Sequence, residues 1–308
     1  MTGSSASRPG RSAVAGRVEM GVEGDGADNE YRISWLASFP KSGNTWTRIL
    51  LTNLMATEPL DEETFAALPG SISSNRPGFD ALTGLPSSDL TDDEIDLARP
   101  GLYRQLAAEA DRHLFVKVHD GYHDCGDGRP LFPAEVSKGA VYLVRHPYDV
   151  AVSYASHQGH GDFDRAVKQI NNPDHIMAGG AKSQLRQRTL GWKGHYRSWT
   201  SQHAIPVLVV RYEDMLTDTR KALASIADFL DLEEKNDPQR IAAAVERSSF
   251  EILRTREDRV GFSERPEKAR RFFRSGRAGD GLAMLSERQR NAIWDVNGDV
   301  MEELGYDR

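Results

Sequence analysis

The chain has 308 residues, of which 39% are hydrophobic and 28% charged, a composition typical of a globular protein with one large domain or two small ones. Its net charge of −7 argues against a general nucleic-acid-binding protein. Apolar runs such as residues 205–210 are too short to cross a bilayer, and no stretch has the pattern of a signal peptide. Because Cys125 is the only cysteine, no intrachain disulfide can form, and we expect a cytoplasmic location without a membrane partner.

Hydrophobic periodicity begins only after an N-terminal segment rich in Gly, Ser and Ala. This segment predicts a disordered tail at residues 1–28, followed by a single domain at 29–308. In chain order, the predicted elements are a strand at 32–39, a helix at 44–56, strands at 114–118 and 140–145, helices at 147–156 and 183–202, a strand at 205–211, and helices at 217–230, 237–247 and 286–304.

Short apolar strands that alternate with helices indicate an α/β fold, with a central parallel sheet covered by helices on both faces. In such folds ligands bind beyond the carboxyl ends of the strands, so we look for functional residues there. Residues 59–90 and 157–182 are rich in Gly, Pro, Asn and Ser, which predicts long surface segments.

The junction between the first strand and its helix, S-F-P-K-S-G-N-T-W at 38–46, contains a possible anion site. Gly43 allows a tight turn, the free N–H groups at a helix start attract anions, and Lys41 adds a cation. The alternative is an ordinary strand–helix turn. A nucleotide-triphosphate loop would need lysine after its second glycine, but here lysine precedes the glycine, and Gly-Lys-Ser/Thr occurs nowhere in the chain.

Positive charge is concentrated near the C-terminus, where the stretch from Arg254 to Arg277 contains nine basic residues and four acidic ones. On an acidic protein this excess is typical either of a site for a compact anionic ligand or of a solvated surface loop.

Six segments, taken together, resemble a known enzyme family. P-K-S-G-N-T-W at 40–46 is similar to the 5′-phosphosulfate loop of sulfotransferases that use 3′-phosphoadenosine 5′-phosphosulfate (PAPS). The other segments follow in the family's order: K-V-H at 117–119, R-H-P-Y-D-V-A-V-S at 145–153, Y-E-D at 212–214, S-S-F-E-I-L at 248–253 and F-F-R-S-G-R-A-G-D at 272–280.

This resemblance implies a P-loop-like three-layer sandwich and an enzyme that moves a sulfuryl group from PAPS to a hydroxyl of a small-molecule acceptor. In the family, rings at the positions of Trp46, Tyr212 and Phe250 surround adenine, and residues at Arg145, Ser153 and Arg274 hold the 3′-phosphate. The implied cofactor-binding residues are Lys41, Ser42, Gly43, Asn44, Thr45, Trp46, Arg145, Ser153, Tyr212, Ser248, Ser249, Phe250, Leu253, Phe272, Phe273, Arg274, Ser275 and Gly276.

Sulfuryl transfer resembles phosphoryl transfer, in which positioning and charge stabilisation supply most of the catalysis. His119 suits the role of general base, because an imidazole titrates near neutrality. Lys41 and Lys117 can neutralise charge on the sulfuryl oxygens and on the leaving phosphate, and the family resemblance implies the same roles. It also implies that Ser153 holds Lys41 back until the acceptor arrives. We predict no metal, although His119 and His123 have a spacing that would suit one on a helix.

Several positions depart from the family pattern. Asn44 replaces a threonine but can still cap the helix, Ser275 replaces a lysine, and Gly281 replaces a tryptophan. The usual dimer motif is missing after Gly281, so the oligomeric state stays open, as does the choice between a hydroxyl and an amine acceptor. The alternatives are a P-loop-like nucleotide kinase or hydrolase and a non-catalytic nucleotide-binding relative.

Overall fold

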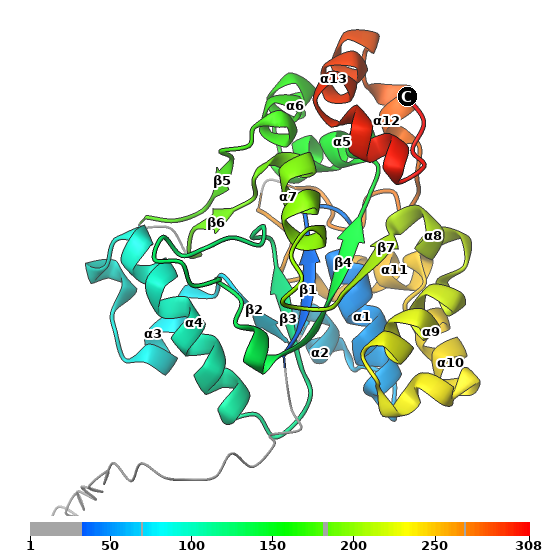
Figure 1. Cartoon of the computed structure of the whole chain (residues 1–308). Coiled ribbons are helices and arrows are strands. Elements are labelled where there is room, and N and C mark those ends of the chain that lie inside the picture. Colours follow the sequence, from blue (N-terminus) through cyan, green and yellow to red (C-terminus); the bar gives the residue numbers. More distant parts are fainter. Residues whose placement is uncertain (1–32, 69, 181–183, 268) are drawn as a thin grey trace, which may run out of the picture. The chain divides into compact units, whose positions relative to one another are not determined.

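The computed structural model describes residues 33–68, 70–180, 184–267 and 269–308. They belong to one compact unit with bounds Tyr31–Arg308, and the tail predicted at 1–28 lies outside the described residues. The centre of the compact unit is a sheet of five parallel strands (Figure 1). In spatial order these are β2 (Ser71–Ile72), β3 (Leu114–Val118), β1 (Ile33–Ser38), β4 (Ser137–Val144) and β7 (Val207–Arg211).

The helices alternate with the strands along the chain (Figure 1). They are α1 (Asn44–Met55), α2 (Glu62–Ala67), α3 (Arg76–Thr83), α4 (Asp92–Ala108), α5 (Pro147–His157), α6 (Phe163–Asn171), α7 (Gly191–Thr200), α8 (Tyr212–Thr217), α9 (Thr219–Phe229), α10 (Pro238–Arg247), α11 (Phe250–Val260), α12 (Asp280–Met284) and α13 (Glu287–Glu303). Three short 3₁₀ turns are found at Ser87–Asp89, Ala134–Val136 and Glu233–Asn236, and β5 (Ile176–Met177) pairs with β6 (Gln187–Arg188) in a separate antiparallel ribbon.

Alternation along the buried strands distributes side chains to both faces of the sheet. Trp35 of β1 packs into a core shared with α4, α5, α6, α7 and α13. Its neighbour Leu36 points into a second core, which β1 and β4 share with α1, α9 and α10. Helices therefore cover both faces, and the predicted three-layer α/β sandwich is confirmed.

Local capping signals placed several helix starts correctly. Pro147 occupies the first turn of α5, and the Asp237 carboxylate accepts hydrogen bonds from the backbone at the start of α10. Ser286 and Gln289 form the predicted capping box of α13.

Three predicted elements need correction. The helix expected over 183–202 begins only at Gly191, because Leu190 and Gly191 have left-handed backbone (φ 58° and 66°) and β6 precedes them; Ser183 itself lies outside the described residues. The helix expected over 217–230 begins two residues later, at Thr219, because Asp218 ends the preceding α8 and caps α9. The surface segments expected at 59–90 and 157–182 contain short elements, among them the edge strand β2.

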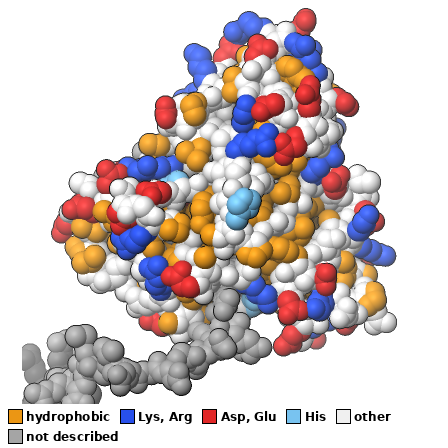
Figure 2. All heavy atoms as spheres, viewed as in Figure 1, with side chains coloured by type: hydrophobic (Ala, Val, Ile, Leu, Met, Phe, Trp, Pro, Cys, Tyr) orange, Lys and Arg blue, Asp and Glu red, His pale blue; other side chains and the backbone are white. Residues whose placement is uncertain are grey.

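Charged side chains of both signs are distributed over the visible surface. On the face in Figure 2, acidic and basic side chains of the described residues are interspersed, with hydrophobic ones gathered toward the middle. No helix in the described ranges combines the length and the apolar character needed to cross a bilayer.

Candidate active site

A cavity of about 830 Å³ lies beyond the carboxyl ends of β1, β3 and β4. Its wall includes the 40–46 loop, the ends of these strands and residues 263–266 and 272–276. Most of the predicted site residues line it: Lys41, Gly43, Asn44, Thr45, Trp46, Lys117, His119, Arg145, Ser153, Tyr212, Phe250, Leu253, Phe272, Phe273, Arg274, Ser275 and Gly276. The fold thus brings together positions that are far apart in the sequence.

The loop before α1 is shaped as an anion cradle. Lys41 and Gly43 both have left-handed backbone (φ 71° and 103°), and a Cβ at Gly43 would lie 2.8 Å from the Tyr212 ring. The first bond of α1 runs from the Thr47 N–H to the Gly43 carbonyl (3.0 Å), so the earlier amides are left for a ligand. The Ser42 hydroxyl is buried without a hydrogen-bond partner among the described residues.

The side chain of Asn44 binds to β1 and does not cap α1 as expected. Its amide donates to the Leu36 carbonyl (2.7 Å) and to the Ser38 hydroxyl (3.2 Å), and it makes no side-chain cap for α1. The side chain therefore ties the start of the helix back to β1, and the helix-capping prediction is wrong.

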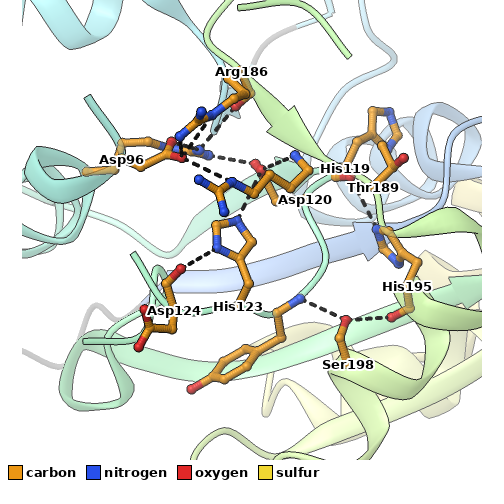
Figure 3. Close-up of polar contacts among 12 residues, drawn as sticks. Asp96, His119, Asp120, His123, Asp124, Arg186, Thr189, His195 and Ser198 are labelled. Carbon is orange, nitrogen blue, oxygen red and sulfur yellow. Dashed lines mark hydrogen bonds and ion pairs between the residues drawn. The ribbon is translucent and has the colours of Figure 1, made fainter. Parts of the chain in front are cut away.

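His119 follows β3 and is held by its surroundings in one orientation. Its Nδ1 lies 2.8 Å from the Ser38 carbonyl oxygen, which only accepts, so Nδ1 carries the proton and Nε2 has the free lone pair. The His119 carbonyl in turn accepts from Nε2 of His195 (3.3 Å; Figure 3). Burial and the charge of Lys117 lower the pKa of His119 to about 3, well below the near-neutral value expected from the sequence, so its imidazole is neutral at pH 7.

Behind His119 lies a buried ion network (Figure 3). The Asp120 carboxylate accepts from the Arg99 guanidinium (2.7 Å) and from the Arg188 backbone N–H (2.9 Å), and the Asp120 carbonyl accepts from Trp199 (3.0 Å). Neither the Arg99 nor the Asp120 side chain is exposed. These bonds fix the backbone that carries His119 against α4, β6 and α7.

Lys41 has a partner that the sequence did not indicate. Its Nζ lies 3.2 Å from Nδ1 of His157 and 4.6 Å from the centre of the Phe272 ring. Burial, followed by the charge of Lys117, lowers the pKa of Lys41 to about 7. Ser153 lines the cavity one helical turn before His157, and within the described part of the chain it is His157 that holds Lys41.

Glu264, another residue that was missed, lies inside the cavity. Its carboxylate forms ion pairs with Lys117 (3.1 Å) and Arg48 and accepts a hydrogen bond from the Thr45 hydroxyl (2.9 Å). The only signal in the sequence was an acidic residue within the basic stretch near the C-terminus.

Aromatic rings also line the cavity. Trp46 packs edge-on against Tyr212, with ring centres 5.8 Å apart, and its Nε1 donates to the Ser248 carbonyl (3.0 Å). A Cβ at Gly276 would lie 2.2 Å from the Phe250 ring. Ser248 and Ser249 do not line the cavity; Ser248 anchors Trp46, and Ser249 precedes α11 at its N-cap.

The basic stretch is anchored to the fold at its C-terminal end. Asp280 accepts from Arg274 (2.6 Å) and Arg277 (2.7 Å), while Asp149 of α5 accepts from the Gly279 and Gly281 N–H groups (2.8 and 2.6 Å). Arg274 therefore reaches the cavity wall from a fixed loop.

The cavity suits an anionic nucleotide. Free helix amides, Lys41, Lys117, Arg145 and Arg274 provide positive charge, and the Nε of Arg145 is buried without a partner among the described residues. The rings of Trp46, Tyr212 and Phe250 provide flat apolar surface for a base. As for metals, His123 contacts Asp124 and Asp120, and within the described ranges no group of three or more His, Cys, Asp and Glu residues is arranged to hold an ion (Figure 3).

Comparisons with known proteins agree with this geometry. The family model of the sulfotransferase domain matches residues 32–305. Luciferin sulfotransferase of Photinus pyralis is 26% identical over 274 residues, which cover 82% of this chain and 67% of the relative. A WSCD family member of Drosophila melanogaster is 28% identical over 63% of this chain, which spans only 49% of that relative.

Solved structures share the fold. Retinol dehydratase, in complex with androsterone and the inactive cofactor PAP, matches with a TM-score of 0.57 and 22% identity over 90% of this chain and 82% of its own. A mouse sulfotransferase complexed with PAP matches with a TM-score of 0.56 and 18% identity over 90% of this chain and 89% of its own. Since the family model spans almost all of the described residues, the chain belongs to the PAPS-dependent sulfotransferase family.

Proposed function

We propose that this sulfotransferase transfers the sulfuryl group of PAPS to a hydroxyl of a small-molecule acceptor, with His119 as general base. The observation that carries the proposal is the environment of His119. Its Nδ1–H is committed to the Ser38 carbonyl, and its ring lines the same cavity as Lys41 and Lys117. The free Nε2 is therefore the atom available to accept the proton of an acceptor hydroxyl.

In this proposal PAPS supplies the activated sulfuryl group, and the chain binds and orients it. The amides of the 40–46 loop, with Ser42, Thr45 and Lys41, hold the phosphosulfate end. Arg145, Ser153 and the 274–276 segment hold the 3′-phosphate, and the rings at positions 46, 212 and 250 enclose adenine.

The two lysines neutralise negative charge where it develops. Lys117 is the penultimate residue of β3, two residues before His119, so one strand end positions both a cation and the base. Lys41 has a pKa of about 7 in the free protein, and an adjacent anion favours its charged form. The cavity thus contains His119 as a neutral base and Lys41 as a cation whose charged form is stabilised by the adjacent anion.

The acceptor end of the cavity is formed by residues of the 59–90 and 157–182 segments, of α5 and of the stretch 184–187. Ile72 and Met177 contribute apolar surface, and Tyr154, Gln184 and Gln187 contribute polar groups. This lining supports a small acceptor with an apolar body and hydrogen-bonding groups. The buried single thiol of Cys125 and the absence of any possible disulfide support a cytoplasmic location as part of the proposal.

A transfer assay with ³⁵S-labelled PAPS and a panel of phenols, alcohols and amines tests the proposal. We expect label in at least one hydroxylated acceptor and unchanged turnover in the presence of a chelator. If PAPS binds but no acceptor is labelled, the non-catalytic alternative is favoured. Preference for Mg·ATP over adenosine 3′,5′-bisphosphate in calorimetry would instead favour the nucleotide kinase alternative.

A further inference from the structure

The cavity contains a negatively charged side chain, Glu264. One Glu264 oxygen accepts from the Thr45 hydroxyl (2.9 Å) and from Lys117 Nζ (3.1 Å), and the other is paired with Arg48. The Glu264 side chain is only 15% exposed. Two of its three partners, Thr45 and Lys117, are residues to which we assign contacts with PAPS.

Glu264 is ionised in this position. Burial disfavours its charge, but Lys117 and Arg48 more than compensate and hold its pKa at about 2. Glu264 in turn stabilises the charged form of Lys117. Burial nevertheless lowers the pKa of Lys117 below its usual value. An anion that enters the cradle therefore competes with a carboxylate already bound to the same donors.

Glu264 lies on a stretch of chain that is anchored on both sides. Before it, Phe262 packs against Phe65, and Ser263 N–H donates to the Ala66 carbonyl (2.9 Å). After it, the Glu257 carboxylate accepts from the backbone of Phe272 and Phe273 (2.6 and 2.9 Å). Between these anchors Arg265, Glu267 and Arg270 are exposed. These anchors therefore do not depend on the contacts of the Glu264 side chain.

We propose that Glu264 is a built-in competitor that prevents tight binding of single inorganic anions in the cradle, while the nucleotide cofactor, which makes further contacts, still binds. To enter, a ligand must replace two ion pairs and a hydrogen bond. PAPS or adenosine 3′,5′-bisphosphate recovers this loss through its second phosphate and its base, at Arg145, Arg274 and the aromatic rings. Inorganic phosphate has no such additional contacts. The inference rests on the proposed function, because it takes Thr45 and Lys117 as part of the PAPS site.

Neutralising Glu264 removes this competition and leaves Lys117 Nζ without the carboxylate with which it is paired. For Glu264→Gln we expect at least about tenfold tighter binding of inorganic phosphate at one fixed salt concentration. The gain for adenosine 3′,5′-bisphosphate should be comparable, because both ligands displace the same carboxylate. Glu267→Gln is the matched control, because Glu267 is exposed three residues further along the same segment and its removal changes net charge equally.

Calorimetry of the full chain with the two ligands separates the outcomes. Tighter phosphate binding in Glu264→Gln, with Glu267→Gln unchanged, supports the proposal. Unchanged or weaker phosphate binding in Glu264→Gln overturns it, while binding of adenosine 3′,5′-bisphosphate to the wild type would leave the proposed function intact. If the wild type and both variants bind no nucleotide, the proposed function itself fails. Glu264→Asp keeps the negative charge on a shorter side chain that reaches the donors less well. This variant should also bind phosphate more tightly than the wild type, and an affinity equal to that of the wild type would count against the inference.

Discussion

Arg99 forms the buried ion pairs that fix the backbone at His119, and its replacement should lower the stability of the fold. Its guanidinium has no exposed surface and contacts three side chains: Asp120 (2.7 Å), Asp96 (3.3 Å) and the Tyr103 hydroxyl (3.2 Å). In Arg99→Met the apolar volume is roughly kept, but Asp120 remains buried with its main counter-charge gone. Breaking a buried pair in this way costs about 3–5 kcal/mol of folding free energy. For a domain of this size that corresponds to a fall in Tm of about 6–20 °C.

The loss should also depend on pH. Although burial opposes ionisation, Arg99 and the hydrogen bond with His123 hold the pKa of Asp120 below its usual value. A carboxyl with a depressed folded-state pKa contributes stability above its unfolded pKa of about 3.9, and this contribution is lost as the pH falls toward the folded value. The difference in stability between wild type and Arg99→Met should therefore be widest near pH 7 and should narrow below about pH 4.

Urea unfolding followed by circular dichroism measures both effects. Arg104→Met is the matched control, since Arg104 lies on the same helix with 45% of its side chain exposed and pairs with Glu135, also exposed. Such a surface pair contributes less than about 1 kcal/mol. An Arg99→Met variant within 1 kcal/mol of the wild type, or a loss that does not change with pH, would refute the reasoning.

Two further predictions concern the cofactor side of the cavity. Gly276→Ala should weaken binding of adenosine 3′,5′-bisphosphate about tenfold or more, because its Cβ would lie 2.2 Å from the Phe250 ring. Gly279→Ala, also left-handed but with open space around it, should keep the affinity, and equal losses in calorimetry would contradict the steric argument. Because the pKa of Lys41 is about 7 and a bound anion raises it, nucleotide binding at pH 8 should take up a proton, measurable in buffers of different ionisation enthalpy. Lys41→Arg, which stays charged, should abolish the uptake, and uptake that persists in this variant would exclude Lys41 as its source.

The sequence was sufficient for features that depend on neighbours in the chain. The strand Leu114–Val118 and the capping box at Ser286 depend on local pattern, as does the Gly43 turn, and all three were found where predicted. The family resemblance supplied most residues of the cavity, because its motifs lie at the ends of these strands.

Contacts between distant parts of the chain could not be predicted. Glu264 meets Arg48 across 216 residues, and His157 meets Lys41 across 116. The two-residue strand β2 exists only because it pairs with the edge of β3, and no pattern of two residues indicates a strand. For α4 a signal was available, since Thr91 and Glu94 form a capping box, but Pro100 within the helix masks the pattern.

The central claim is that His119 removes the acceptor's proton beside a nucleotide held by the 40–46 loop. Parallel measurement of kcat and of the Kd for adenosine 3′,5′-bisphosphate in His119→Ala tests it most directly, with Lys41→Ala and Arg274→Ala for comparison. We expect kcat to fall by at least about 100-fold in His119→Ala while Kd stays within about threefold of the wild type, since a general base contributes to the transition state and little to cofactor binding. Both lysine and arginine variants should lose affinity as well as turnover. Full turnover in a folded His119→Ala protein would contradict the claim.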